Sequence, residues 1–125
     1  MQEIKTANAP TFDEFPFSQA IEHDGVVHLS GNVPLDPDTG EFVDGGIAAE
    51  AEQVMENIGA VLEEAGSSFD NVIKATVFIT DPDDFEAFNE VYKEYLDEPY
   101  PARSAVVTDL VVDVSVEVEV VAAVE

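Results

Sequence analysis

The sequence predicts an α+β fold in which one mixed β-sheet carries two helices on one of its faces. Apolar segments with strand periodicity and two amphipathic helical segments follow in the order strand, strand, helix, strand, helix, strand, strand. The chain has 125 residues, about the length of one domain, and no linker or internal repeat divides it. We therefore expect residues 1–125 to form a single domain.

Helical periodicity is clearest over residues 47–65. Apolar residues recur there at intervals of three and four: Ala51, Val54, Met55, Ile58, Val61, Leu62 and Ala65. The glutamates of this segment are expected on or beside its solvent-facing side: Glu50, Glu52, Glu56, Glu63 and Glu64. Gly66 ends the helix.

A second helix is predicted after Asp81, which is placed to cap a first turn that contains Pro82. Its buried side is expected to consist of Phe85, Phe88, Tyr92, Tyr95 and Leu96. Asn57 in the first helix and Asn89 in the second lie near the apolar stripes. Each amide has two interpretations, a hydrogen-bonded helix residue or a ligand contact, and the residue pattern favours the first.

Strands are predicted at residues 26–30, 73–79, 104–108 and 114–124. In the last of these, alternate residues share a face, so the valines point one way and Ser115, Glu117 and Glu119 point the other. With both helices on the valine side, the glutamate side is left uncovered. A sheet face that is neither covered by helices nor uniformly polar predicts assembly with other copies of the chain.

Charge is the most unusual property of the composition. The chain has 28 Asp and Glu against 4 Lys and Arg, a formal net charge of −24. Such a surface repels nucleic acid and anionic membranes, so neither is expected as a partner. The acids are spread evenly, and at molar salt the screening length falls to about 3 Å, which removes their repulsion. We therefore expect a halophilic protein; the alternative is an acidic mesophilic one.

Several classes of protein are excluded or disfavoured by missing sequence features. There is no cysteine, hence no disulfide and no thiol chemistry. No apolar run is long enough to span a bilayer, and no signal peptide is visible, so we expect a cytoplasmic protein. Phosphate-binding loops and the serine-hydrolase elbow are missing. His23 and His28 lack the partners of a metal site, so no metal is expected.

Arg103 is the strongest candidate for a functional side chain. It is the only arginine, and it lies between a proline turn and an apolar strand. A guanidinium offers a planar fork of donors that matches a carboxylate, which lysine does not reproduce. The alternative is a structural ion pair with one of the many acids.

Glu117 and Glu119 lie two residues apart on one strand face. Side-by-side carboxylates are unfavourable unless they are hydrated or paired, and partial burial of one would raise its pKa into a range useful for acid–base chemistry. The alternative is a solvated strand face in a very acidic protein.

Short segments along nearly the whole chain resemble the Rid (reactive intermediate deaminase, or YjgF) family. The segments that carry the resemblance are Pro16-Phe17-Ser18-Gln19, Leu29-Ser30-Gly31-Asn32-Val33-Pro34-Leu35, Leu62-Glu63-Glu64-Ala65-Gly66, Phe88-Asn89-Glu90-Val91-Tyr92, Pro101-Ala102-Arg103-Ser104 and Val116-Glu117-Val118-Glu119. The last two are the most specific. Their occurrence together and in order identifies the chain as a member of this family.

The resemblance implies a chorismate-mutase-like fold that assembles as a homotrimer around a barrel, with clefts between subunits. It implies hydrolysis of 2-imino acids and their enamine tautomers, such as 2-iminopropanoate and 2-iminobutanoate, to 2-oxo acids and ammonia, without a cofactor. By the same resemblance Arg103 clamps the substrate carboxylate and Glu117 positions the attacking water. The expected residues of the cleft are Phe17, Ser30, Gly31, Asn89 and Ala105.

The chain departs from the family pattern at several positions. Phe17 replaces the usual tyrosine, Asn32 a common glutamine and Ala105 a frequent cysteine. The segment 109–113 is one residue shorter than in the family pattern, which changes the spacing between Arg103 and the glutamates. Glu119 is therefore an alternative to Glu117. Two other functions stay open: a trimer that binds metabolites without catalysis, and a ribonuclease, which the charge opposes. A chaperone-like role has no distinctive feature in the sequence.

Overall fold

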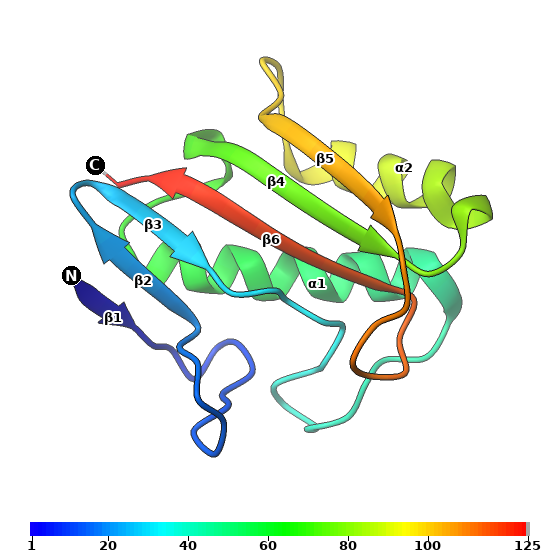
Figure 1. The fold of residues 1–125 in the computed structure, drawn as a ribbon, viewed down its shortest axis with the longest axis horizontal. Coiled ribbons are helices and arrows are strands. Elements are labelled where there is room, and N and C mark those ends of the chain that lie inside the picture. The colour runs from blue at the N-terminus through cyan, green and yellow to red at the C-terminus, as the bar shows by residue number, and fades with distance from the viewer. Residues whose placement is uncertain (125) are drawn as a thin grey trace.

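One six-stranded sheet organises the structure, a computed structural model that describes residues 1–124 (Figure 1). Its strands are β1 (Gln2–Ile4), β2 (Ala20–His23), β3 (Val26–Leu29), β4 (Val72–Ile79), β5 (Ala102–Val107) and β6 (Val116–Ala123). They lie in the order β1-β2-β3-β6-β4-β5, with β4 and β5 parallel and the other neighbours antiparallel. The predicted mixed sheet is confirmed, whereas β1 and β2 lie outside the residue ranges predicted for strands.

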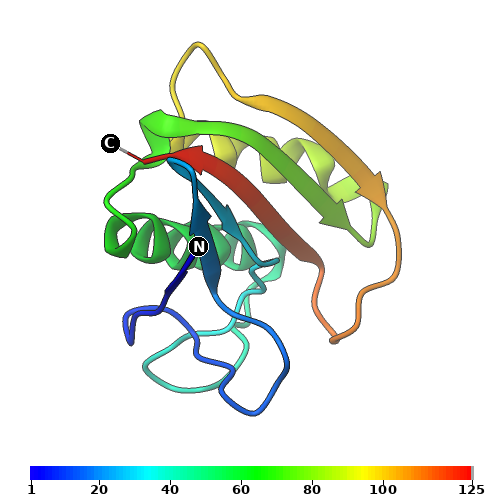
Figure 2. The same ribbon diagram turned by 60° about the vertical axis from the view of Figure 1, so that its left-hand side comes forward.

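Both helices lie on the same side of this sheet, which curves over them (Figure 2). They are α1 (Gly46–Glu64) and α2 (Phe85–Tyr95), and they pack against each other as well as under the sheet. A 3-10 turn, Pro82–Asp84, precedes α2, and the Asp81 carboxylate accepts a hydrogen bond of 2.9 Å from the backbone N–H of Asp83. The predicted cap is confirmed, although the turn that it caps is a 3-10 turn rather than α-helix.

The period of β6 decides which of its residues reach the core. Val116, Val118 and Val120 are buried beneath the helices, whereas Glu117 and Glu119 are half-buried on the opposite, helix-free face. The apolar stripe of α1 is buried as predicted, and on α2 Phe88 and Tyr92 are buried while Phe85 and Tyr95 are half-buried. The predicted alternation in β6 is therefore confirmed.

Glu50 corrects one expectation. Its side chain is buried, with 8 % of the residue exposed, and its carboxylate accepts a hydrogen bond of 2.7 Å from the backbone N–H of Ser115. The segment that leads into β6 covers this end of α1, and its N–H needs an acceptor once it is removed from water. The other glutamates of α1 are exposed as expected.

Asn57 ties α1 to the segment that follows β3. Only 1 % of the residue is exposed, and Nδ2 donates to the carbonyl oxygens of Val33 and Leu35 at 3.2 and 2.9 Å. Its Oδ1 accepts from Gln53 Nε2 at 2.9 Å. The expectation that Asn57 is a hydrogen-bonded structural residue is confirmed.

The substitution Asn57→Ala is expected to lower the free energy of unfolding by about 1–3 kcal/mol, because two carbonyl oxygens lose their donor in a site closed to water. Denaturant unfolding measures the difference. Glu63→Ala, on the exposed side of the same helix, is the control and should stay within about 0.5 kcal/mol of the parent. Equal stability of parent and Asn57→Ala would contradict the proposed anchoring role.

Within residues 1–124, no helix has both the length and the apolar character needed to cross a membrane.

Candidate functional site

Arg103 lies on the side of β5 that faces the helices. Its Cα is paired with that of Ala75 on β4, and Ala75 is in turn paired with Val120 on β6. Both partners are buried under the helices, with exposed fractions of 0 % and 3 %. Because residues in register share a face, the Arg103 side chain is directed toward α2.

Three side chains of α2 orient the guanidinium of Arg103. Its Nη1 donates to Asn89 Oδ1 at 2.8 Å, and its central carbon lies 4.9 Å from the ring centroid of Tyr92 and 5.3 Å from that of Phe85. Cation–π contact favours a planar cation held over an aromatic ring. The contacts therefore restrain the plane of the guanidinium while leaving most of its N–H donors free.

No carboxylate neutralises Arg103 among residues 1–124. The ion pairs in that part of the chain are Lys5 with Asp13, His23 with Asp24, and Lys93 with Glu90. The alternative that Arg103 forms a structural ion pair is therefore wrong for the described residues. In a protein with a net charge of −24, this is a cation available to an anionic ligand.

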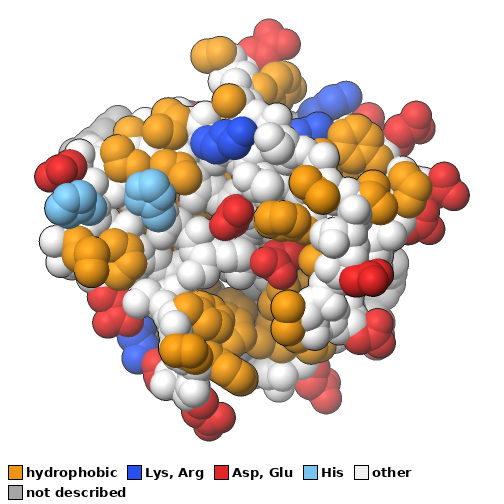
Figure 3. Space-filling view, in the orientation of Figure 1, with side chains coloured by type: hydrophobic (Ala, Val, Ile, Leu, Met, Phe, Trp, Pro, Cys, Tyr) orange, Lys and Arg blue, Asp and Glu red, His pale blue; other side chains and the backbone are white. Residues whose placement is uncertain are grey.

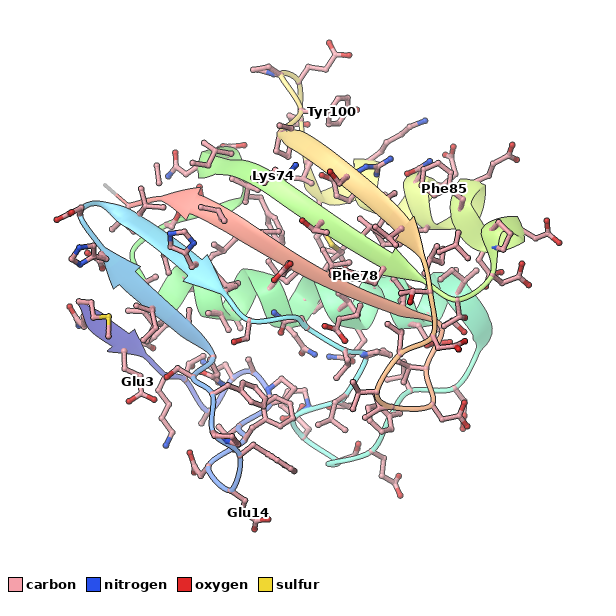
Figure 4. All side chains as sticks on the ribbon, in the orientation of Figure 1. Glu3, Glu14, Lys74, Phe78, Phe85 and Tyr100 are labelled. Atoms are coloured by element: carbon pink, nitrogen blue, oxygen red, sulfur yellow. The ribbon has the colours of Figure 1, made fainter. Side chains whose placement is uncertain are left out.

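A hollow of about 660 Å³ opens beside Arg103. Figure 4 shows two residues at this edge of the sheet, Phe85 on α2 and Tyr100 just before β5. The lining comes from α2 and from the segment that enters β5: Glu86, Ala87, Asn89, Glu90, Tyr92, Lys93, Tyr100, Pro101 and Arg103. The site thus combines one restrained cation with aromatic surface.

Glu117 lies on the other face of the sheet. It is paired with Phe78 on β4, which Figure 4 labels near the middle of the helix-free face. Burial, and secondarily the neighbouring charge of Glu119, raise the pKa of the Glu117 carboxyl above its ordinary value. A protonated fraction of this group therefore persists at higher pH than for a hydrated glutamate.

Glu117 forms part of the wall of a second hollow, of about 430 Å³. In Figure 3, hydrophobic side chains surround a recess in the lower part of the helix-free face. The residues around the second hollow are Phe12, Phe15, Phe17, Ser30, Gly31, Val33, Val111, Val112 and Glu117. Glu119 is paired with Thr76 on the same sheet face and is not among them.

Gly31 permits the close approach of the Glu117 carboxyl to the backbone. A Cβ at position 31 would overlap Glu117 Oε2. The segment is held in place by Asn32, whose N–H donates to the carbonyl of Val118 at 2.7 Å and whose carbonyl accepts from Val118 N–H at 3.1 Å. The Glu117 carboxyl therefore lies against the backbone of Gly31, and position 31 requires glycine because any side chain there would overlap the carboxyl.

The substitution Gly31→Ala is expected to destabilise the protein by about 1–3 kcal/mol, because the new methyl group must displace the Glu117 carboxyl or the segment above it. The measurement is a double-mutant cycle with Glu117→Ala, which removes the group that the methyl would meet. In that background Gly31→Ala should cost much less. An equal cost in both backgrounds would contradict the proposed contact.

Two hydrogen-bonding residues shape the segments next to this hollow. The Ser30 hydroxyl donates to the carbonyl of Ser18 at 2.6 Å. The Gln19 amide Nε2 donates to the carbonyls of Pro10 and Thr6 at 2.7 and 3.0 Å, and its Oε1 accepts from Thr6 N–H at 2.7 Å. Gln19 thereby anchors both ends of the segment that carries the three phenylalanines.

The structure divides the predicted site residues into two groups. Phe17, Ser30 and Gly31 lie with Glu117, whereas Asn89 lies with Arg103. Ala105 is exposed two residues beyond Arg103 on β5, paired with Val77. Arg103 and Glu117 are therefore on opposite faces, and a single chain does not bring them together.

Four aromatic residues of these sites are not evident as site residues from the sequence pattern. The pattern predicts Phe85 and Tyr92 only on the buried side of α2, although both rings contact the guanidinium of Arg103. Phe12 and Phe15 fall outside every segment predicted to carry the site, although their rings lie 6.4 Å apart in the wall of the Glu117 hollow. The available signal was the spacing of three phenylalanines within residues 12–17.

Fold and site together define a small α+β protein in which Arg103, unneutralised within residues 1–124, and the half-buried Glu117 lie on opposite sheet faces. The model of the family described as Endoribonuclease L-PSP matches residues 6–124. The chain therefore belongs to this family, which the sequence analysis identified as the Rid or YjgF family, and that prediction is confirmed.

Three similar proteins illustrate this membership. A RutC family protein of Pyrococcus horikoshii is 48 % identical over 95 % of this chain and 94 % of its own. The human 2-iminobutanoate/2-iminopropanoate deaminase is 44 % identical over 82 % of this chain and 74 % of its own. The crystal structure of RidA from the Antarctic bacterium Psychrobacter sp. PAMC 21119 superposes with a TM-score of 0.94 at 42 % identity, covering 99 % of this chain and 100 % of that one.

Proposed function

We propose that this protein is a deaminase that hydrolyses 2-imino acids and their enamine tautomers, including 2-iminopropanoate and 2-iminobutanoate, to 2-oxo acids and ammonia. The observation that carries the proposal is the unneutralised, aromatic-supported guanidinium of Arg103. It matches a carboxylate ligand, and the half-buried Glu117 provides an acid–base group. The name of the human relative supports the same chemistry.

Arg103 would orient the substrate. Nη1 is hydrogen-bonded to Asn89, and the remaining donors of the planar fork would bind both oxygens of the substrate carboxylate. A fixed carboxylate places C2 of the iminium in one position for attack. Asn89 would act through Arg103, since its carbonyl oxygen is directed at the guanidinium rather than at the ligand.

Glu117 would move the protons of the reaction. As the carboxylate, it takes a proton from water while the water oxygen forms a bond to C2, which gives a tetrahedral carbinolamine. It then returns that proton to the nitrogen and, as a carboxylate again, takes the proton of the carbinolamine hydroxyl. The carbon–nitrogen bond breaks as C2 becomes the carbonyl of the 2-oxo acid, and ammonia leaves, carrying that last proton away as ammonium. A pKa raised by burial suits a group that both accepts and donates within one cycle.

The active site would be completed by a second copy of the chain in a homotrimer. Arg103 and Glu117 face opposite sides of one sheet, so Arg103 of one copy would meet Glu117 of another. The helix-free face carries apolar surface suited to assembly, including the exposed side chain of Val106 and the half-buried Phe78. Light scattering should then give three times 13.5 kDa.

Complementation between two inactive variants tests the shared site. Co-expressed Arg103→Ala and Glu117→Gln chains, in equal amounts, should regain about one quarter of parental activity, because random pairing unites an intact arginine with an intact glutamate in that share of sites. Each variant alone is the control. Activity no higher than that of the separate variants, in trimers shown to contain both chains, would place both residues within one chain and contradict the proposal.

Turnover itself is tested with imines produced in the assay by an amino-acid oxidase. Faster loss of the imine in the presence of this protein, with release of the matching 2-oxo acid, is the expected result. No acceleration for any imine, with 2-oxo acids still bound at Arg103, would favour the alternative of a binding protein without catalysis.

A further inference from the structure

We propose that the Glu117 hollow selects 2-imino acids with bulky apolar side chains, branched aliphatic or aromatic, over those with short or hydroxyl-bearing side chains. This inference rests on the proposed function, since it assigns the substrate class of the same site. It is carried by the wall of the hollow, in which six apolar side chains surround one carboxyl: Phe12, Phe15, Phe17, Val33, Val111 and Val112.

The three phenylalanines form one cluster. Phe12 lies 5.1 Å from Phe17 and 6.4 Å from Phe15, and Phe15 lies 6.3 Å from Phe17, measured between ring centroids. Despite these contacts, Phe15 and Phe17 remain 58 % and 46 % exposed. Apolar rings gathered at the surface beside a carboxyl have the character of a ligand wall rather than of a core.

Polar groups in this hollow have few donors to offer a ligand. The Ser30 hydroxyl already donates to the carbonyl of Ser18 at 2.6 Å, and Phe17 has no hydroxyl. Glu117 is the one ionisable group in the wall. A hydroxyl on the substrate side chain would therefore find few donors to replace those of water, whereas additional methylene groups would gain apolar contact.

The hollow has room for such side chains. Its volume of about 430 Å³ lies within the range of small-molecule pockets. Because Glu117 and the three phenylalanines line the same hollow, a substrate whose C2 lies next to the Glu117 carboxyl would direct its side chain along the phenylalanine cluster. We therefore assign the cluster to the substrate side chain rather than to a surface of another copy.

Binding of 2-oxo acids, the products, tests this selectivity independently of turnover. By calorimetry, affinity should rise about fourfold for each added methylene from 2-oxobutanoate to 2-oxohexanoate. It should also be high for 4-methyl-2-oxopentanoate and phenylpyruvate, and lowest for 3-hydroxy-2-oxopropanoate. The imines of the matching amino acids should follow the same order in kcat/KM.

Phe17→Ser is expected to reduce the gain in affinity for each added methylene group. Phe17→Tyr is expected to reduce the difference in affinity between apolar and hydroxyl-bearing 2-oxo acids. Phe42→Ser is the matched control, since Phe42 is similarly exposed, at 42 %, but is not part of the wall of this hollow; it lines the neighbouring hollow, which shares Val111 and Val112. It should leave the order unchanged. Light scattering checks that each variant keeps the parental mass.

The outcomes separate the two proposals. A graded binding series without any imine turnover supports the selectivity and overturns the deaminase assignment. Turnover with a flat or reversed series overturns the selectivity alone. Loss of the parental mass in Phe17→Ser, with the ligand order unchanged, would make the cluster a contact between copies and likewise overturn the selectivity.

Discussion

Arg103→Lys is expected to slow imine hydrolysis nearly as much as Arg103→Ala, each by about 10²-fold or more in kcat/KM. Lysine retains the charge but replaces a planar fork by a mobile point charge. It also loses the hydrogen bond to Asn89 and the planar group held over Tyr92 and Phe85. Turnover of 2-iminobutanoate, with circular dichroism and trimer mass as folding controls, measures the effect.

Asn89→Ala provides an intermediate variant for the same experiment. It keeps the guanidinium and its aromatic platform but removes the acceptor that lies 2.8 Å from Nη1. Its kcat/KM should fall between those of the parent and of Arg103→Lys, mainly because the substrate carboxylate binds more weakly. A lower affinity for 2-oxo acids, which carry the same carboxylate, would measure this loss of binding. Full activity in a folded, trimeric Arg103→Ala would show that Arg103 is not the carboxylate clamp.

The substitution Glu117→Gln is expected to reduce turnover by about 10²–10⁴-fold while leaving 2-oxo acid binding within a few-fold of the parent. Glutamine keeps the shape of the side chain next to Gly31 but neither accepts nor releases the proton. The matched variant Glu119→Gln removes the neighbouring carboxylate and should retain activity. The pH profile of its turnover should move to lower pH, because the charge of Glu119 contributes to the raised pKa of Glu117. Loss of activity in Glu119→Gln alone would exchange the two roles.

The pH dependence of stability should reveal the raised pKa of the Glu117 carboxyl independently of activity. Because folding raises the pKa of Glu117 above its ordinary value of 4.5, the folded protein holds this proton more tightly than the unfolded chain. The free energy of unfolding therefore falls as pH rises from about 4.5 through the raised pKa. Glu117→Gln removes this contribution, so its melting temperature should increase relative to that of the parent as pH rises toward neutrality. A difference that stays constant with pH would contradict the raised pKa.

The local pattern of the sequence determined much of the fold. The spacing of apolar residues located both helices, the alternation in residues 114–124 separated the valines from Glu117 and Glu119, and Asp81 marked the turn before α2. These features depend on interactions between residues close in the chain, so period and capping chemistry are sufficient to predict them. The rarity of arginine was likewise enough to single out Arg103.

Only the tertiary structure decided how these elements meet. Glu50 is buried because the segment before β6, which is remote in sequence, covers it. The register of β4 with both β5 and β6 places Arg103 and Glu117 on opposite faces, and the fold of the N-terminal segment brings Phe12, Phe15 and Phe17 to Glu117. The period of a strand defines its two faces, but the pairing of strands decides which faces coincide, and pairing depends on contacts between residues far apart in the chain.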